Sequence, residues 1–180
     1  MARVKSAVAR QDYPEQGIKK GQKYYYWSFV RQPRQMSATY PRPSQLCNNK
    51  FSGALAAMET LSDEVDKATS IEDITSAIED AKSSLEEVKS EYEDALSSLE
   101  QAFQGGSPQI DEHQEKVSNL ESCIDELDGA ATEVSTLDAS DYANGEYKKD
   151  PEGFDDLNEE DQGEMLQAAK DLASEVSLEG

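Results

Sequence analysis

A run of apolar residues between positions 71 and 102 constrains the fold of this chain most strongly. Its members recur at alternating steps of three and four residues: Ile71, Ile74, Ile78, Ala81, Leu85, Val88, Tyr92, Ala95, Leu99 and Ala102. These steps place every member on one stripe of an α-helix, and their persistence over more than four heptads is typical of a coiled-coil seam. A chain with this stripe must bury it against another helix.

A second stripe follows after a short break in the pattern. Residues 105–108 (Gly-Gly-Ser-Pro) combine glycine, which suits a helix end, with proline, which suits a first helical turn. The same steps then resume in Ile110, His113, Val117, Leu120, Ile124, Leu127, Ala131 and Val134. Two stripes joined by so short a loop predict an antiparallel hairpin over residues 71–104 and 108–137. The pattern leaves open whether the seams pair within one chain or between chains.

Charge is divided unevenly along the chain. Residues 1–50 contain ten Lys and Arg and two acids, a net charge of +8, whereas residues 51–180 contain seven Lys and Arg and 36 acids, a net charge of −29. Such asymmetry is a sign of an interaction arm or tail. It also allows the basic part to dock on the chain's own acidic helices, which is an alternative to an external partner.

The basic part contains the strongest strand signal. Residues 23–31 read KYYYWSFVR and are rich in aromatic and β-branched types. Alternation along a strand places Tyr24, Tyr26, Ser28 and Val30 on one face and Tyr25, Trp27, Phe29 and Arg31 on the other. Shorter signals flank this strand: a strand and turn at 18–22, a turn at 32–35 and a return strand at 36–40. Residues 1–17 are polar, and no strand is predicted there.

The expected fold class is therefore mainly α. A small β-hairpin or three-stranded module over residues 1–43 precedes an acidic helical region over 44–137, whose first helix starts near Ser44, an acceptable N-cap. Residues 138–163 lose the helical period and are interpreted as an acidic linker, partly disordered. An amphipathic C-terminal helix is predicted over residues 164–178.

Few residues offer catalytic chemistry. His113 is the single histidine and falls on a seam position, so it is interpreted as a packed helix residue. Cys47 and Cys123 are interpreted as small buried residues rather than nucleophiles. Residues 150–161 are rich in oxygen ligands, but they lack the glycine and glutamate that an EF-hand loop needs at its sixth and twelfth positions. We expect no enzyme, no metal and no cofactor.

The expected location is the cytoplasm, or the host cytoplasm if the protein is viral. Two distant cysteines do not make a disulfide framework, and the basic N-terminus has no apolar run of the secretory type. No stretch approaches 18 apolar residues, so no membrane partner is expected.

The basic, aromatic module is the best functional signal. Lysine and arginine neutralise phosphates, and flat rings stack on bases. The predicted nucleic-acid-binding residues are Lys19, Lys20, Lys23, Tyr25, Trp27, Arg31 and Arg34. The alternative is that one aromatic face forms the core of the module, since so short a segment has few other apolar residues.

The stretch GIKKGQKYYYWSF over residues 17–29, together with SATYP over 37–41, resembles the three-stranded arm-binding modules at the N-termini of phage integrases. The resemblance covers about 25 residues and implies a sheet placed in the DNA major groove. The sequence departs from the family at residues 32–35, where QPRQ replaces a glycine-rich turn, and no integrase catalytic domain follows. With PRPSQL over 41–46, the stretch also looks like small uncharacterised proteins of tailed phages.

Three kinds of function are compatible with these features. The first is a non-enzymatic, phage-type accessory protein that contacts nucleic acid or a nucleoprotein complex with its basic module and a basic partner with its acidic helices. The second is an acidic DNA mimic that inhibits a host nucleic-acid-binding or defence protein. The third is a structural virion or assembly protein that forms homo-oligomers through its coiled coil.

Overall fold

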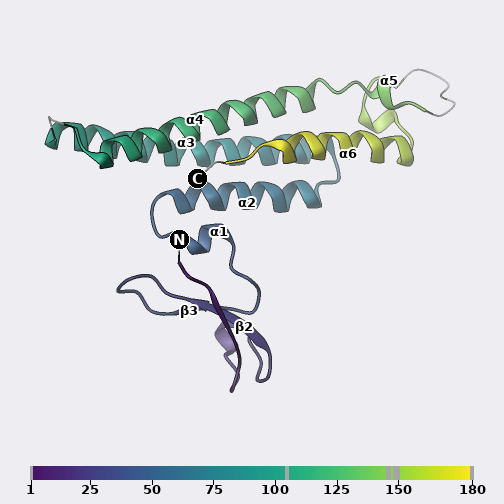
Figure 1. Cartoon of the computed structure of the whole chain (residues 1–180). Coiled ribbons are helices and arrows are strands. Elements are labelled where there is room, and N and C mark those ends of the chain that lie inside the picture. Colours follow the sequence, from purple (N-terminus) through teal and green to yellow (C-terminus); the bar gives the residue numbers. More distant parts are fainter. Residues whose placement is uncertain (1, 104–105, 145–146, 148–150, 179–180) are drawn as a thin grey trace. The chain divides into compact units, whose positions relative to one another are not determined.

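The computed structural model of the chain describes residues 2–103, 106–144, 147 and 151–178. The chain divides into two compact units, Met1–Ala56 and Ala57–Gly180, and each is considered by itself. The expected fold class is confirmed, because a three-stranded antiparallel sheet precedes long helices and a C-terminal helix (Figure 1).

The sheet of the first unit has the order β1-β2-β3, and both neighbouring pairs are antiparallel. Its strands are β1 (Lys5–Val8), β2 (Lys23–Trp27) and β3 (Gln35–Ser37). The strand β1 lies in the polar segment 1–17, where the sequence gives no strand signal. Every residue of β1 is exposed or half-buried, so the strand forms by backbone pairing with β2 and leaves no apolar alternation in the sequence.

The connections between the strands also differ from the prediction. The segment 18–22 is not a strand: Ile18 pairs with Tyr13 in an isolated bridge beside the 3₁₀-helix η1 (Pro14–Gln16). Gly21 then turns the chain with a φ of +86°, a conformation that glycine adopts without strain. After β2, the turn runs from Phe29 to the Gln32 amide, three residues earlier than expected.

The first unit extends past residue 43 because two contacts attach the segment that follows. The Trp27 Nε1–H donates to the Gln45 carbonyl oxygen at 3.0 Å, and the Ala2 amide donates to the Leu46 carbonyl at 3.1 Å. Both acceptors lie in α1 (Pro43–Leu46), which is a single turn rather than the start of a long helix. The long helix α2 (Phe51–Lys67) begins where the Asn49 side chain accepts from the Phe51 amide.

The predicted hairpin is formed within one chain by α3 (Ile71–Ala102) and α4 (Pro108–Ser135), which run antiparallel (Figure 1). The most deeply buried members of the two stripes are Ile74, Ile78, Leu85, Leu120, Leu127 and Val134. The seams are therefore buried intramolecularly. Residues 104 and 105 of the predicted loop lie outside the described residues.

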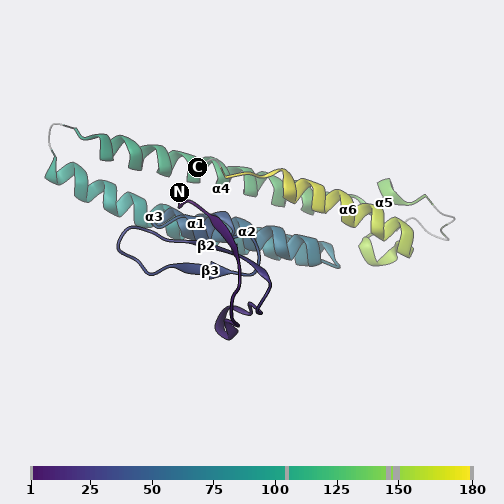
Figure 2. The same cartoon turned by 60° about the horizontal axis from the view of Figure 1, so that its bottom comes forward.

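Two further helices cover the hairpin. α6 (Glu159–Glu175) packs against both α3 and α4 (Figure 2). The thiol of Cys123 in α4 donates to the Met58 sulfur in α2 at 3.9 Å, and the Lys170 ammonium of α6 donates to the Asp66 carbonyl of α2. These helices explain why Ala77, Cys123 and Ala130, which lie outside the two predicted seams, are also buried.

The segment predicted as an acidic linker is folded in its described part. It contains α5 (Ala139–Tyr142), the 3₁₀-helix η2 (Phe154–Asp156) and the first turn of α6. α6 begins at residue 159 rather than 164 because the Asn158 side chain accepts from the Glu160 and Asp161 amides and caps it. Residues 145–146 and 148–150 of this segment lie outside the described residues.

Candidate nucleic-acid interface

The register of the sheet separates the side chains of β2 onto two faces. Residues directly opposite each other in an antiparallel pair point to the same face. Lys5 and Met36 both oppose Tyr26, and Ala7 opposes Tyr24. These five side chains therefore share one face.

The other face of β2 is anchored by Trp27. This side chain is 3% exposed, and its indole N–H is satisfied by the Gln45 carbonyl. Tyr25, two residues earlier, packs edge-on against Tyr40 at 5.3 Å between ring centroids, and the Lys23 Nζ lies 5.3 Å from the Tyr25 centroid. Burial excludes Trp27 from contact with a ligand while the unit is folded, so its predicted role in binding is replaced by a role in the core.

The face of Tyr24 and Tyr26 carries a continuous chain of rings. The Tyr13 and Tyr24 centroids are 6.0 Å apart, and those of Tyr24 and Tyr26 are 5.9 Å apart. The guanidinium carbon of Arg34 lies 4.7 Å from the Tyr26 centroid, within cation–π range. The three tyrosines are half-buried and Arg34 is exposed. We call the surface made by these side chains, with Lys5, Ala7 and Met36, the tyrosine face.

The predicted cations lie in the loops and at the strand ends around the sheet. Lys19, Lys20, Lys23, Arg31 and Arg34 are all exposed. Within the described chain, none of these five side chains is in a salt bridge. Their charge is therefore available to an anionic ligand.

Arg31 has an unusual backbone conformation. It is the third residue of the turn in which the Gln32 amide donates to the Phe29 carbonyl at 3.2 Å, and its φ is +62°. Glycine or asparagine is favoured at such a position, because other side chains are strained there by about 1–2 kcal/mol. The preceding residue, Val30, is 89% exposed at the same tip. The turn thus presents a cation at the edge of the sheet at some cost in stability.

Sequence reasoning assigned Tyr24 and Tyr26 to a common face but did not choose that face for binding. The alternation of side chains along β2 places these two tyrosines on one face, but no local pattern indicates which face of the strand α1 covers. Tyr13 and Lys5 were missed altogether. Tyr13 reaches the face only through its bridge with Ile18, and Lys5 through the unpredicted strand β1.

The helical unit presents a different surface, which is dense in carboxylates. Every Asp and Glu of α3 and α4 is exposed. Ion pairs cross the hairpin from Lys82 to Asp128 and from Lys89 to Glu121, the second at 3.1 Å. Exposed pairs of this kind contribute at most about 1 kcal/mol each, so they hold the surface in place only weakly.

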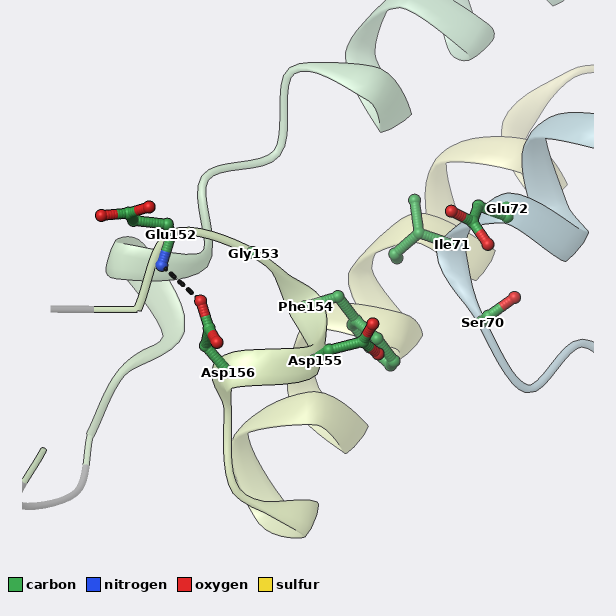
Figure 3. A pocket seen from close by; sticks show the side chains of 8 residues that line it. All are labelled: Ser70, Ile71, Glu72, Glu152, Gly153, Phe154, Asp155 and Asp156. Atoms are coloured by element: carbon green, nitrogen blue, oxygen red, sulfur yellow. Dashed lines mark hydrogen bonds between the residues drawn. The ribbon is translucent and has the colours of Figure 1, made fainter. Parts of the chain in front are cut away.

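A pocket of about 420 Å³ lies beside the first turn of α3 in this unit. Its lining includes the apolar side chains of Ile71 and Phe154, and the acids around it are Glu72, Glu152, Asp155 and Asp156. Figure 3 shows that Ile71 and Glu72 line the pocket from the start of α3, and Phe154 and Asp155 line it from η2. Both apolar residues pack against the cluster of Ala139, Leu157 and Met165. The pocket therefore combines an apolar wall with negative charge.

A buried carboxylate stabilises the corner next to this pocket. Asp161 is 3% exposed and accepts hydrogen bonds from the Tyr147 hydroxyl, the Asn158 side-chain amide at 2.9 Å and the Asn144 amide at 3.2 Å. Burial, followed by the contacts with Asp161, raises the pKa of the Tyr147 hydroxyl. The carboxylate is fully satisfied, so we assign it to holding the chain between α5 and α6.

The reactive side chains of the helical unit are packed. Burial, with a smaller contribution from Glu126, raises the pKa of the Cys123 thiol to about 11 and disfavours the thiolate. His113 packs edge-on against Tyr92 at 5.3 Å between centroids, and its Nδ1 donates to the Gln109 carbonyl. Among the described residues, no group of three or more His, Cys, Asp and Glu side chains is placed to hold a metal ion. No helix in the described part of the chain is long and apolar enough to cross a membrane.

Comparison with known proteins finds no matching family model, no matching curated protein and no matching solved structure.

Proposed function

We propose that the first unit binds nucleic acid through the tyrosine face and the cations around it. The observation that supports this proposal is the combination of a chain of three half-buried rings with exposed lysines and arginines that have no salt-bridge partner in the described chain. Cations attract phosphates regardless of sequence, and rings contact bases. A surface that neutralises a handful of phosphates binds non-specifically with a Kd of about 10⁻⁴ to 10⁻⁶ M.

The test is fluorescence anisotropy of labelled DNA and RNA oligonucleotides titrated with the full chain at several salt concentrations. The triple variant Lys19→Ala, Lys20→Ala, Lys23→Ala removes three exposed cations around the sheet, two in the loop before β2 and one at its first residue, on the face of Tyr25. We expect the affinity to fall by about tenfold or more. The slope of log K against log salt should become shallower by about 0.7–0.9 for each phosphate that the variant no longer neutralises.

A matched control separates local binding from overall charge. The variant Ser83→Glu, Ser90→Glu, Ser97→Glu lowers the net charge by the same amount at exposed positions of α3. It should leave both the affinity and the salt slope close to those of the parent protein. Equal losses of affinity in the two variants, or no binding by the parent chain, would overturn the proposal.

For the helical unit we propose a basic protein partner, on the evidence of the pocket beside α3. The apolar side chains of Ile71 and Phe154 suit the methylene stem of a lysine or arginine, and the surrounding carboxylates suit its charged end. The pair Glu72→Gln, Asp155→Asn should weaken calorimetric binding of a short arginine-leucine peptide severalfold. The control pair Glu100→Gln, Asp111→Asn lies near the far end of the hairpin and should leave peptide binding unchanged. Equal losses in the two pairs would mean that the peptide responds to the overall negative charge rather than to the pocket.

The other two functions make different predictions. A DNA mimic would be insensitive to the lysine variant and sensitive to neutralisation of the acids over residues 72–100 or 138–161. A structural coiled-coil protein would form oligomers whose size rises with concentration in light scattering. Packing of the two seams against each other within one chain counts against the structural alternative, which needs a seam to pair with a second copy.

A further inference from the structure

We propose that the tyrosine face binds the unpaired bases of single-stranded nucleic acid by stacking, in preference to the grooves of a duplex. The inference rests on the proposed function of the first unit and names the form of its ligand. It concerns the chemical character of the side chains on this face of the sheet. It holds for single strands of DNA or RNA, since both present the same flat bases.

The first step is the division of polar groups between the two faces. Ser6 and Ser37 oppose Tyr25, and Gln35 opposes Trp27, so these hydrogen-bonding side chains lie on the face opposite to the tyrosine face. The tyrosine face carries rings, Ala7, Met36 and two cations. A sheet that reads a major groove needs amide or guanidinium groups aimed at base edges. Asparagine and glutamine are absent from this face of the described strands, and the Arg34 guanidinium lies against the Tyr26 ring.

The second step is the arrangement of the rings. Tyr13, Tyr24 and Tyr26 follow one another at centroid distances of 6.0 and 5.9 Å. In a duplex the faces of the bases are covered by their neighbours, and only their edges can be reached. In a single strand the faces are accessible, and a row of rings can receive successive bases whatever their sequence.

The third step is the placement of charge beside the rings. Lys5 opposes Tyr26 across the sheet, and the Arg34 guanidinium lies against the ring of the same tyrosine. A guanidinium is itself a flat surface for a base and a partner for phosphate. A nucleotide at Tyr26 would therefore find a stacking surface and two cations for its phosphates.

The experiment compares an unstructured single strand, labelled dT12, and its RNA counterpart with a 12-base-pair duplex, all titrated with the full chain by anisotropy. We expect the single strands to bind at least severalfold more tightly. Tyr24→Leu and Tyr26→Leu should each weaken single-strand binding by roughly 5- to 150-fold, the range found when one stacking ring is removed. Tyr24→Phe and Tyr26→Phe should retain binding, because the ring remains.

Tyr40→Leu is the matched control, since it removes a tyrosine that is 63% exposed and packs with Tyr25 on the other face. It should leave single-strand affinity unchanged. Photocrosslinking of the unaltered chain to a strand containing 5-iodouracil gives a second measurement that does not depend on the folding of a variant. Crosslinks are expected at Tyr13, Tyr24 or Tyr26, and crosslinks confined to other residues would refute the stacking.

The outcomes separate the two proposals. Equal or tighter duplex binding that both the leucine and the lysine variants weaken would overturn the single-strand inference and leave the proposed function intact, whereas leucine variants that bind every probe normally would remove the tyrosine face from both proposals. Absence of binding to every probe would overturn both. Single-strand preference with sensitivity at Tyr24 and Tyr26 would support both.

Discussion

The helical unit buries its apolar side chains as a regular series, whereas the first unit depends on a few large ones far apart in the sequence. Leu85, Leu120 and Leu127 are fully buried and belong to stripes that repeat along whole helices. In the first unit, Trp27 is the β2 side chain that joins the sheet to α1. A regular series spreads the stabilisation over many residues, so no single one decides the fold. A small core concentrates the stabilisation in a few residues, so one substitution can unfold the whole unit.

The substitution that should distinguish the two units most clearly is Trp27→Ala. The change removes the largest buried side chain of the first unit and leaves the Gln45 carbonyl without its donor. We expect the free energy of unfolding to fall by about 3–5 kcal/mol, which is enough to unfold a small unit. Near-ultraviolet circular dichroism would report the tyrosine cluster, and the signal at 222 nm would report the helices. The near-ultraviolet signal of the tyrosines should be lost, and the helical signal at 222 nm should be retained.

Trp27→Phe separates packing from hydrogen bonding in the same position. It keeps a ring and removes the N–H, so we expect a smaller destabilisation of about 1–2 kcal/mol. If Trp27→Ala lowered the melting temperature of the helices as much as that of the sheet, the two units would unfold as one. The contrast between them would then fail.

The second prediction concerns the centre and the end of the seam. Leu127→Ala creates a cavity at a fully buried position and should cost about 2–5 kcal/mol in urea unfolding followed at 222 nm. Leu99→Ala, at a half-buried position toward the loop end of α3, should cost clearly less. Equal costs at the two positions would mean that the seam is packed uniformly along its length.

The same contrast explains which parts of the fold could be predicted from the sequence. The hairpin was predictable because each step of three or four residues, as from Ile78 to Ala81 and from Ala81 to Leu85, repeats one geometric rule. The strand β1 was not, because Lys5 to Val8 carry no apolar alternation and pair only through the backbone. The start of α6 was missed although Asn158 and the acids after it form a recognisable cap.

The residue types of the candidate site could be predicted from the sequence, but the face of the sheet on which each residue lies could not. The cations Lys19, Lys20, Lys23, Arg31 and Arg34 were identified from charge alone, and the structure leaves all five exposed. Trp27, which was also predicted to bind, is buried in the folded unit because the covered side of β2 depends on α1, whose Gln45 carbonyl accepts from its indole N–H. Such a tertiary interaction has no counterpart in a local pattern.

The third prediction tests how the hairpin begins. The Asp73 carboxylate accepts from the Thr69 amide at 3.0 Å and from Ser70, and these hydrogen bonds lower its pKa from the ordinary 3.8. A depressed folded pKa means that the charged form stabilises the fold. This contribution is complete above pH 3.8 and disappears as the pH falls through the lower folded value.

Asp73→Asn should therefore be less stable than the parent chain at pH 5 to 7, by an amount smaller than the seam effects. The difference should shrink as the pH falls from 3.8 through the lower folded pKa, below which the parent carboxylate is neutral as well. Urea midpoints of both proteins measured across this range at constant ionic strength would check it. A difference that does not change with pH would assign the effect to altered hydrogen-bond geometry rather than to charge.

The smallest expected effect lies at the tip of the sheet, where stability and binding are opposed. Arg31→Gly relieves a left-handed backbone conformation worth about 1–2 kcal/mol, and the added flexibility of glycine offsets about half of that gain. The first unit should become more stable by less than about 1 kcal/mol, while nucleic-acid affinity falls because an exposed cation is removed. Arg31→Asn tolerates the same conformation and also removes the charge. If both variants melt higher and bind more weakly, the residue at this turn is retained for its charge against its conformational cost, which the regular helices of the second unit never incur.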